Sequence, residues 1–212
     1  MPKEMHATKL AILKATERLV AAHGFEATSL RAITAAAKVN LAAVNYHFST
    51  KDALILAMLN RRLGPINEAR LVLLDRFEKE AGENPVALEK ILEALFRPVL
   101  DEVSRRSQGG RDFLRLLALA LAEPSAYLKP LVEKEFSEKT RRFHRALRRA
   151  LPRLSECEAH WRLHFAHGVF LHTVTHSEVL ECTSRGRCRI SDPEATLRRI
   201  IHFCAAGLRS AP

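Results

Sequence analysis

The 212-residue sequence has few of the residues that interrupt helices or are enriched in β-sheets. It contains 8 glycines, 9 prolines, 2 tyrosines and 1 tryptophan, whereas Ala, Leu, Arg and Glu, which favour helices, are frequent. This composition argues against a β-sandwich and predicts an all-α fold. A chain of this length buries about 70% of the surface that its unfolded form exposes, so it needs neither disulfides nor a metal to fold.

Cysteine pairs and long apolar runs are also missing. The four cysteines (Cys157, Cys182, Cys188 and Cys204) lie in the last third of the chain and form no C-x-x-C motif. This pattern favours reduced thiols in a cytoplasmic protein. No stretch reaches the roughly 18 consecutive apolar residues of a membrane span, and charged residues interrupt the N-terminal region. The sequence therefore predicts a soluble protein without a membrane helix or a signal peptide.

Positive charge exceeds negative charge, but the excess lies mostly outside the N-terminal region. The net charge of +10 favours an anionic partner, because Lys and Arg that neutralise phosphates release counterions. Residues 1–52 hold seven Lys and Arg against four Asp and Glu, so they contribute +3 and the rest of the chain +7. Charge therefore supports nucleic-acid binding only modestly and does not locate it.

The first 40 residues carry the start and stop signals of two helices. Thr8 is expected to cap a helix that runs to His23, where Gly24 provides a left-handed end. Thr28 is expected to cap a second, shorter helix over residues 29–37, whose apolar residues form one inward stripe.

A third short helix, over residues 41–47, follows a turn at Lys38 and Val39. In this helix and its end only Val44 and Phe48 are expected to face inward. Two short helices joined by such a turn form a helix-turn-helix, whose second helix enters the major groove of DNA. Periodicity alone leaves open an ordinary helical bundle with the outward residues in solvent. The residues expected to contact DNA are Thr28, Ser29, Arg31, Asn40, Leu41, Ala42, Asn45, Tyr46, His47 and Lys51.

A family resemblance is carried by residues 24–54, GFEATSLRAITAAAKVNLAAVNYHFSTKDAL, which resemble the DNA-binding signature of the TetR family of repressors. Within this family, the run VNLAAVNYHF and the LGP at residues 63–65 are similar to the fatty-acid-responsive PsrA-like branch. The segments FLRLLALAL and HWRLHFAHG extend that similarity more weakly. The resemblance implies recognition contacts at residues 40–45. It also implies phosphate contacts at Thr28, Ser29, Tyr46, His47 and Lys51.

Two residues depart from the family pattern. Most members have glycine where this chain has Lys38, so a bulky residue with a positive φ is predicted in the turn, at some local cost in free energy. Most members also have tyrosine at the position of Asn45. The usual phosphate contact is therefore not expected there, and a contact of Asn45 with a base becomes the hypothesis.

The resemblance implies two domains. These are a helix-turn-helix DNA-binding domain over residues 1–52 and a helical ligand-binding and dimerisation domain over residues 53–212. A fourth helix is expected to start near Thr50, and Gly64-Pro65 is expected to kink or break it. Turn-forming residues then separate further helices, which are expected over residues 85–106, 111–122, 125–150, 155–181 and 193–209.

The resemblance further implies that the last two helices pair with those of a second subunit as a four-helix bundle. The final helix agrees with this, because its apolar stripe is wider than one face of a solvated helix needs. The stripe comprises Leu197, Ile200, Ile201, Phe203, Cys204, Ala205 and Leu208. A homodimer is therefore predicted, and its two-fold symmetry predicts a palindromic DNA operator.

The C-terminal domain is expected to hold a pocket for a small hydrophobic effector that releases the repressor from DNA. By resemblance to the PsrA-like branch only, this effector is a long-chain fatty acid or its acyl-CoA. Arg115 interrupts an apolar run, so it either binds an acidic head group or pairs with a glutamate on a neighbouring helix. The residues expected to line the pocket are Phe96, Phe113, Arg115, Leu116, His164, Phe165, Gly168 and Leu171.

A group of histidines raises the alternative of a metal sensor or a metal-dependent enzyme. His160, His164 and His167 are spaced i, i+4 and i+7, and His172 and His176 form a second i, i+4 pair. The H-E-x-x-H order of a zinc hydrolase is absent, so the sequence favours pocket or core histidines, with no metal, no cofactor and no enzymatic activity. A helical adaptor that binds partners through its basic faces is a third hypothesis.

Overall fold

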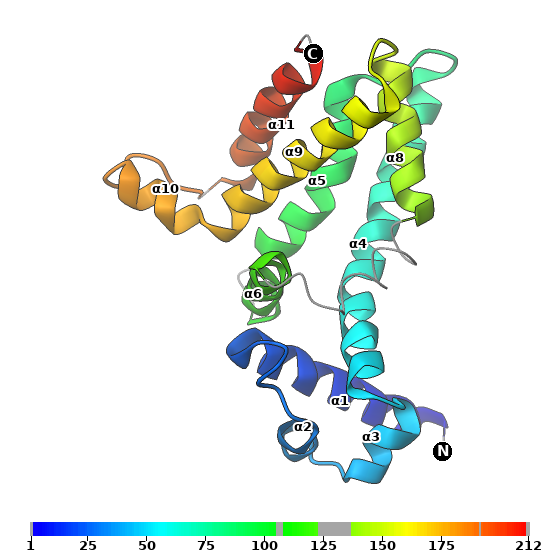
Figure 1. Cartoon of the computed structure of the whole chain (residues 1–212), viewed down its shortest axis with the longest axis vertical. Coiled ribbons are helices and arrows are strands. Elements are labelled where there is room, and N and C mark those ends of the chain that lie inside the picture. The colour runs from blue at the N-terminus through cyan, green and yellow to red at the C-terminus, as the bar shows by residue number, and fades with distance from the viewer. Residues whose placement is uncertain (1, 105–107, 123–136, 191, 211–212) are drawn as a thin grey trace. The chain divides into compact units, whose positions relative to one another are not determined.

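The computed structural model describes residues 2–104, 108–122, 137–190 and 192–210 of the chain. Every regular element in these ranges is a helix (Figure 1). The predicted all-α fold is thereby confirmed.

The chain divides into two compact units. Unit 1 consists of residues 1–64 and 107–134, and unit 2 of residues 65–106 and 135–212. These units group residues by their packing and not by their function. The expected functional boundary after residue 52 therefore stays a prediction.

The helices are distributed between the two units, and α4 contributes to both. Those of unit 1 are α1 (Pro2–His23), α2 (Leu30–Ala37), α3 (Leu41–His47), the first part of α4 (Lys51–Ala81) and α6 (Gln108–Ala122). Those of unit 2 are the rest of α4, α5 (Leu88–Ser104), α8 (Ser137–Ala150), α9 (Glu156–Thr175), α10 (Ser177–Thr183) and α11 (Pro193–Arg209).

The core of unit 1 holds α2 and α3 in place. Helices of eight and seven residues are too short to be stable alone in water, so their stability comes from the side chains that they bury. Ile33 of α2 and Val44 of α3 are buried in one apolar cluster with Phe25, Phe48 and residues of α1 and α4. Glu17 of α1 is also buried, and it forms ion pairs with two arginines at the end of the unit 1 part of α4.

Unit 2 is built around α5, which packs against α11 and also contacts α8 and α9. The apolar face of α5 is buried from Leu88 to Leu100. Arg162 of α9 lies inside this unit and donates hydrogen bonds to the Leu208 carbonyl at 2.8 Å and the Ser210 carbonyl at 2.7 Å. It therefore satisfies carbonyl groups at the end of α11 that the helix itself leaves without a donor.

In the N-terminal half, one expected helix boundary was wrong, and of the kink or break expected at Gly64-Pro65 the break does not occur. Helix α1 begins at Pro2 and not after Thr8, because proline is well suited to the first helical position and good helix formers follow it. Helix α4 continues through Gly64 and Pro65. The proline removes one backbone hydrogen bond, but Leu59 before it and Ile66 after it are both buried, so packing holds the helix on each side.

The expected helix over residues 155–181 is divided in two. It breaks at His176, between α9 and α10. Thr173 and Thr175 each donate a side-chain hydrogen bond to the carbonyl four residues earlier, at 2.7 Å, and such bonds compete with the helical ladder and bend it. Of the helix expected over residues 125–150, the part before Ser137 lies outside the described residues.

Candidate nucleic-acid interface and ligand pocket

The turn between α2 and α3 is formed by hydrogen bonds between close neighbours in sequence. The Ser29 hydroxyl accepts a hydrogen bond from the Ala32 amide at 3.1 Å and caps the start of α2. At the end of α2, Lys38 adopts φ 56° and ψ 45°, and the Val39 amide donates to the Thr34 carbonyl at 3.0 Å. The positive φ predicted for Lys38 is therefore confirmed.

Helix α3 presents one face to the core of unit 1 and the other to solvent. The Oδ1 atom of Asn40 accepts a hydrogen bond from the Ala43 amide at 2.8 Å and caps the helix. Val44 and Phe48 are buried, as predicted, whereas Tyr46 is 72% exposed. The outward face is thus narrow apart from one aromatic ring, as entry into a major groove requires. Its exposed residues are Leu41, Ala42, Asn45 and Tyr46.

Hydrogen-bond donors and positive charge border this face. Arg31 of α2 is exposed. The Lys51 ammonium donates to the Glu26 carbonyl at 3.2 Å, which ties the start of α4 to the loop before α2. The Thr50 hydroxyl accepts from the Ala53 amide at 3.0 Å, and the other first-turn amides of α4 give its N-terminus a partial positive charge.

One residue expected at this face is placed elsewhere. Thr28 is 2% exposed, and its hydroxyl donates to the Gly24 carbonyl at 2.8 Å. Its side chain therefore stabilises the loop between α1 and α2, and Ser29 caps α2 in its place. His47 is partly buried, with its ring edge-on to that of Tyr46 at 5.2 Å between centroids.

Unit 2 contains a pocket of about 250 Å³ between α4, α5, α8 and α9, which we call the Arg70 pocket. Its wall combines apolar side chains with an arginine and several histidines. The lining residues are Asn67, Arg70, Leu95, Thr140, Phe143, His144, His160, Leu163, His164 and His167.

Arg70 is fixed in this wall by two hydrogen bonds. Its Nε donates to the Leu95 carbonyl at 2.8 Å, and its Nη1 donates to Oδ1 of the buried Asn67 at 3.1 Å. Burial lowers the pKa of Arg70 to about 10, so the guanidinium stays charged at neutral pH. The pocket therefore holds a positive charge in a fixed orientation.

The histidines of the pocket differ in their surroundings. Burial, followed by the nearby charge of Arg70, lowers the pKa of His167 to about 4. His167 is therefore neutral at pH 7, and its Nδ1 donates to the Leu163 carbonyl at 2.8 Å. The rings of His144 and His160 lie 3.6 Å apart between centroids, and burial lowers the pKa of His144.

Two family models match the chain. The family described as "Bacterial regulatory proteins, tetR family" matches residues 12–58, and the one described as "Tetracyclin repressor-like, C-terminal domain" matches residues 93–207, which is more than half of the chain. The chain belongs to the TetR family. It is therefore a DNA-binding, ligand-responsive transcriptional regulator and not an enzyme.

Solved structures of other regulators share the fold. A TetR family transcription regulator from Marinobacter aquaeolei VT8 is 20% identical, with 96% of each chain covered and a TM-score of 0.62. A putative transcriptional regulator from Pseudomonas aeruginosa PAO1 is 18% identical, with 93% of this chain and 86% of that chain covered and a TM-score of 0.63. The fatty acid degradation regulator FadR from Bacillus halodurans is 15% identical, with 96% and 97% covered and a TM-score of 0.63. No curated protein matches the chain.

The effector-site residues expected for this TetR regulator are dispersed. Only His164 lines the Arg70 pocket. Phe96 is fully buried and stacked on Phe170, with ring centroids 4.7 Å apart, so it belongs to the core. Phe165 is 59% exposed, Gly168 is exposed and Leu171 is partly buried.

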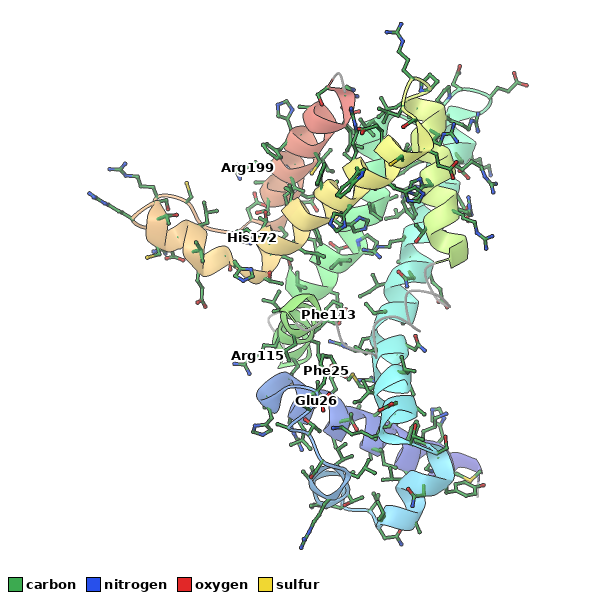
Figure 2. All side chains as sticks on the ribbon, viewed as in Figure 1. Phe25, Glu26, Phe113, Arg115, His172 and Arg199 are labelled. Atoms are coloured by element: carbon green, nitrogen blue, oxygen red, sulfur yellow. The ribbon has the colours of Figure 1, made fainter. Side chains whose placement is uncertain are left out.

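The other three expected residues lie on α6, which belongs to unit 1. Phe113 and Leu116 are buried there. Arg115 is exposed and points away from α6 (Figure 2). A carboxylate partner was expected only for a buried Arg115, and this side chain is not buried.

Sequence reasoning missed Asn67 and Arg70, although a signal was present. Both lie on the stripe of α4 that includes the buried Leu74 and Phe77, at a spacing of i, i+3, i+7 and i+10. Polar residues on an otherwise apolar stripe are costly to bury, so they mark a site where they have partners or line a cavity.

The described ranges contain no metal site that would support the metal-sensor alternative. There, no three His, Cys, Asp or Glu side chains come together in a way that could hold a metal ion. His172 and His176 stack on each other with ring centroids 4.7 Å apart. In the same ranges, no helix has the length and apolar character that crossing a membrane demands.

Proposed function

We propose that this protein is a homodimeric repressor that binds a palindromic operator and is released from it by a small hydrophobic effector. The observation that carries the proposal is the outward face of α3, which is anchored to the core by Val44 and Phe48 and leaves Asn45 and Tyr46 exposed. Direct base contacts come from residues 40–45 of each subunit. Contacts with phosphates come from Ser29, Arg31, Tyr46, His47 and Lys51.

Exposed aromatic residues support the dimer. Trp161 and Phe165 of α9 and Phe203 of α11 are each more than half exposed, and the last two border a hollow between α9 and α11. Aromatic residues at such a density on one face are typical of a protein interface. A two-fold axis at this face repeats the recognition helix, which is why the operator is expected to be a palindrome.

The effector is proposed to bind in the Arg70 pocket. The resemblance to the PsrA-like branch favours a fatty acid or its derivative, and one structure of the same fold is described as a fatty acid degradation regulator. The difference in effector binding free energy that this requires is modest. A hundredfold loss of operator affinity needs about 2.7 kcal/mol of difference in effector binding between the free and the DNA-bound form.

Fluorescence anisotropy with a labelled palindrome from the region upstream of the gene tests the docking. Tyr46→Ala combined with His47→Ala should weaken binding to operator and to random DNA alike, by about tenfold or more, because phosphate contacts carry no sequence information. Tyr46→Phe serves as the control that separates the hydroxyl from the ring. Unchanged affinity of the double variant would refute the assigned DNA face.

Analytical ultracentrifugation of the full chain tests the dimer. Phe203→Glu places a charge on the proposed interface and should give monomers. Val72→Glu, on α4, changes a side chain of similar exposure, 66% in both cases, and should remain dimeric. If both variants stay dimeric, the interface lies elsewhere.

A further inference from the structure

The Arg70 guanidinium lacks a counter-charge, unlike comparable arginines of unit 2. Among the described residues of this unit, the other arginines that are buried or partly buried are Arg97, Arg142 and Arg162, and each forms an ion pair with Asp or Glu. No carboxylate in the described ranges lies within 4.0 Å of Arg70, whose hydrogen bonds go to a carbonyl and an amide oxygen. A partly buried cation without a carboxylate neighbour gains from an anionic partner.

The geometry of Arg70 leaves one edge of its guanidinium for such a partner. Nε and Nη1 are held by Leu95 and Asn67, and Nη2 makes no hydrogen bond to any described residue. Because Asn67 is itself buried, the guanidinium plane is fixed before a ligand arrives. A planar donor group held in this way matches a carboxylate, which can accept two parallel N–H bonds.

The rest of the wall limits the charge of the ligand. Arg70 is the one permanently charged residue in the lining. His167 is neutral at pH 7, because burial lowers its pKa to about 4. The same lining offers apolar surface from Leu95, Phe143 and Leu163. One cation in an otherwise largely apolar lining suits a monoanion with an apolar body better than it suits a phosphate ester.

The volume limits the size of the ligand. A cavity of about 250 Å³ falls below the range of roughly 300–1,000 Å³ that is usual for drug-sized ligands. It exceeds the ~150 Å³ of an engineered apolar cavity that binds benzene. An aromatic or short-chain acid fits this space, whereas the nucleotide part of an acyl-CoA does not.

We infer that the effector is a compact monocarboxylic acid whose free carboxylate is bound by Arg70. This inference rests on the proposed function, since it names the ligand class of the same pocket. It favours a free acid over the acyl-CoA ester, because the ester has no carboxylate at the end of its acyl chain for the guanidinium to bind.

Calorimetric titration of the full-length protein with phenylacetate and octanoate tests the inference, with phenylacetamide and octanamide as neutral counterparts of the same shape. Both acids should bind, and each amide should bind about thirtyfold more weakly, since it leaves the partly buried guanidinium without a counter-charge. Palmitoyl-CoA should not compete with either acid. The inference fails if an amide binds as well as its acid, if palmitoyl-CoA displaces the acid, or if neither acid binds.

Two variants locate the binding to one residue. Arg70→Met should weaken acid binding by about thirtyfold or more, and Arg70→Lys should restore part of it, because lysine keeps the charge but not the planar donor pair. Arg76→Met is the matched control on the same helix, since Arg76 is exposed and pairs with Glu80. Equal acid affinity in Arg70→Met and Arg76→Met would overturn the assignment.

Operator affinity measured without any acid, in the wild type and in each variant, reports on the proposed repressor function separately. If the wild type binds the acids through Arg70 but never binds the palindrome, the repressor proposal fails while the ligand class stands. If it binds the palindrome and the acids have no effect on that binding, the pocket is not the effector site.

Discussion

Replacing Lys38 by glycine should stabilise the helix-turn-helix. Lys38 has φ 56° and ψ 45°, a left-handed conformation in which the Cβ of an L-residue crowds its own backbone. Relief of this crowding contributes about 1–2 kcal/mol. Glycine also lowers the stability by about 0.5–1 kcal/mol, because the unfolded chain has more conformational freedom to lose at a glycine. The expected net gain is therefore about 0.5–1 kcal/mol.

Lys38→Ala is the matched control, because it removes the same charge and keeps the Cβ. The hydrogen bond from Val39 to Thr34 that closes the turn involves backbone atoms only, so both variants retain it. Lys38→Ala should therefore differ little from the wild type in stability, and Lys38→Gly should exceed it by about 1 kcal/mol. Operator affinity should be the same for both, since both lack the ammonium.

Hydrogen exchange measured by mass spectrometry gives the local readout, since the only tryptophan, Trp161, lies in unit 2 and does not report on this turn. Peptides covering residues 30–48 should exchange about fivefold more slowly in Lys38→Gly than in Lys38→Ala, which corresponds to about 1 kcal/mol. Equal exchange, or faster exchange in Lys38→Gly, would refute the claim that strain is stored at this residue.

Three further predictions concern buried ionisable side chains. Glu17→Gln removes the buried carboxylate that pairs with Arg61 and Arg62 and should lower the free energy of unfolding by about 3 kcal/mol, measured by urea titration and circular dichroism. His167, whose pKa burial lowers from 6.5 to about 4, adds stability that is complete above pH 6.5 and is lost as the pH falls toward 4. Wild type should therefore lose about 2 kcal/mol more than His167→Gln between pH 7 and 4.5. Arg162→Met removes two donors from the end of α11 and should cost about 2–4 kcal/mol, followed by the fluorescence of Trp161; no loss would mean that solvent satisfies those carbonyls.

Much of the candidate DNA-binding face could be predicted from the sequence because its geometry depends on near neighbours. The Asn40 cap and the left-handed Lys38 are set by hydrogen bonds that span three to five residues. The burial of Val44 and Phe48 follows from the spacing of apolar residues along a short helix. The wrong prediction of Thr28 as the cap of α2 is also local, because it misplaces the cap by one residue. Thr28 and Ser29 are adjacent hydroxyl residues, and only the loop conformation decides which of them is turned inward.

The helix breaks were harder to predict because local propensity and packing compete there. Pro65 costs α4 a hydrogen bond, and the sequence alone does not show that Leu59 and Ile66 are both buried. The break at His176 is the opposite case. Two threonines whose side chains bond back to the helix weaken it where the sequence shows no glycine or proline.

The helical class, the family and the outward face of the third helix could all be inferred from the residues alone. All of these depend on composition or on patterns within a few residues. The ligand pocket, by contrast, could be located only in the folded protein, because its wall joins α4, α5, α8 and α9. The Leu95 carbonyl that holds Arg70 lies 25 residues away in sequence. The direction in which Phe165 or Arg115 points depends on which face of each helix its neighbours cover, and periodicity does not specify those neighbours.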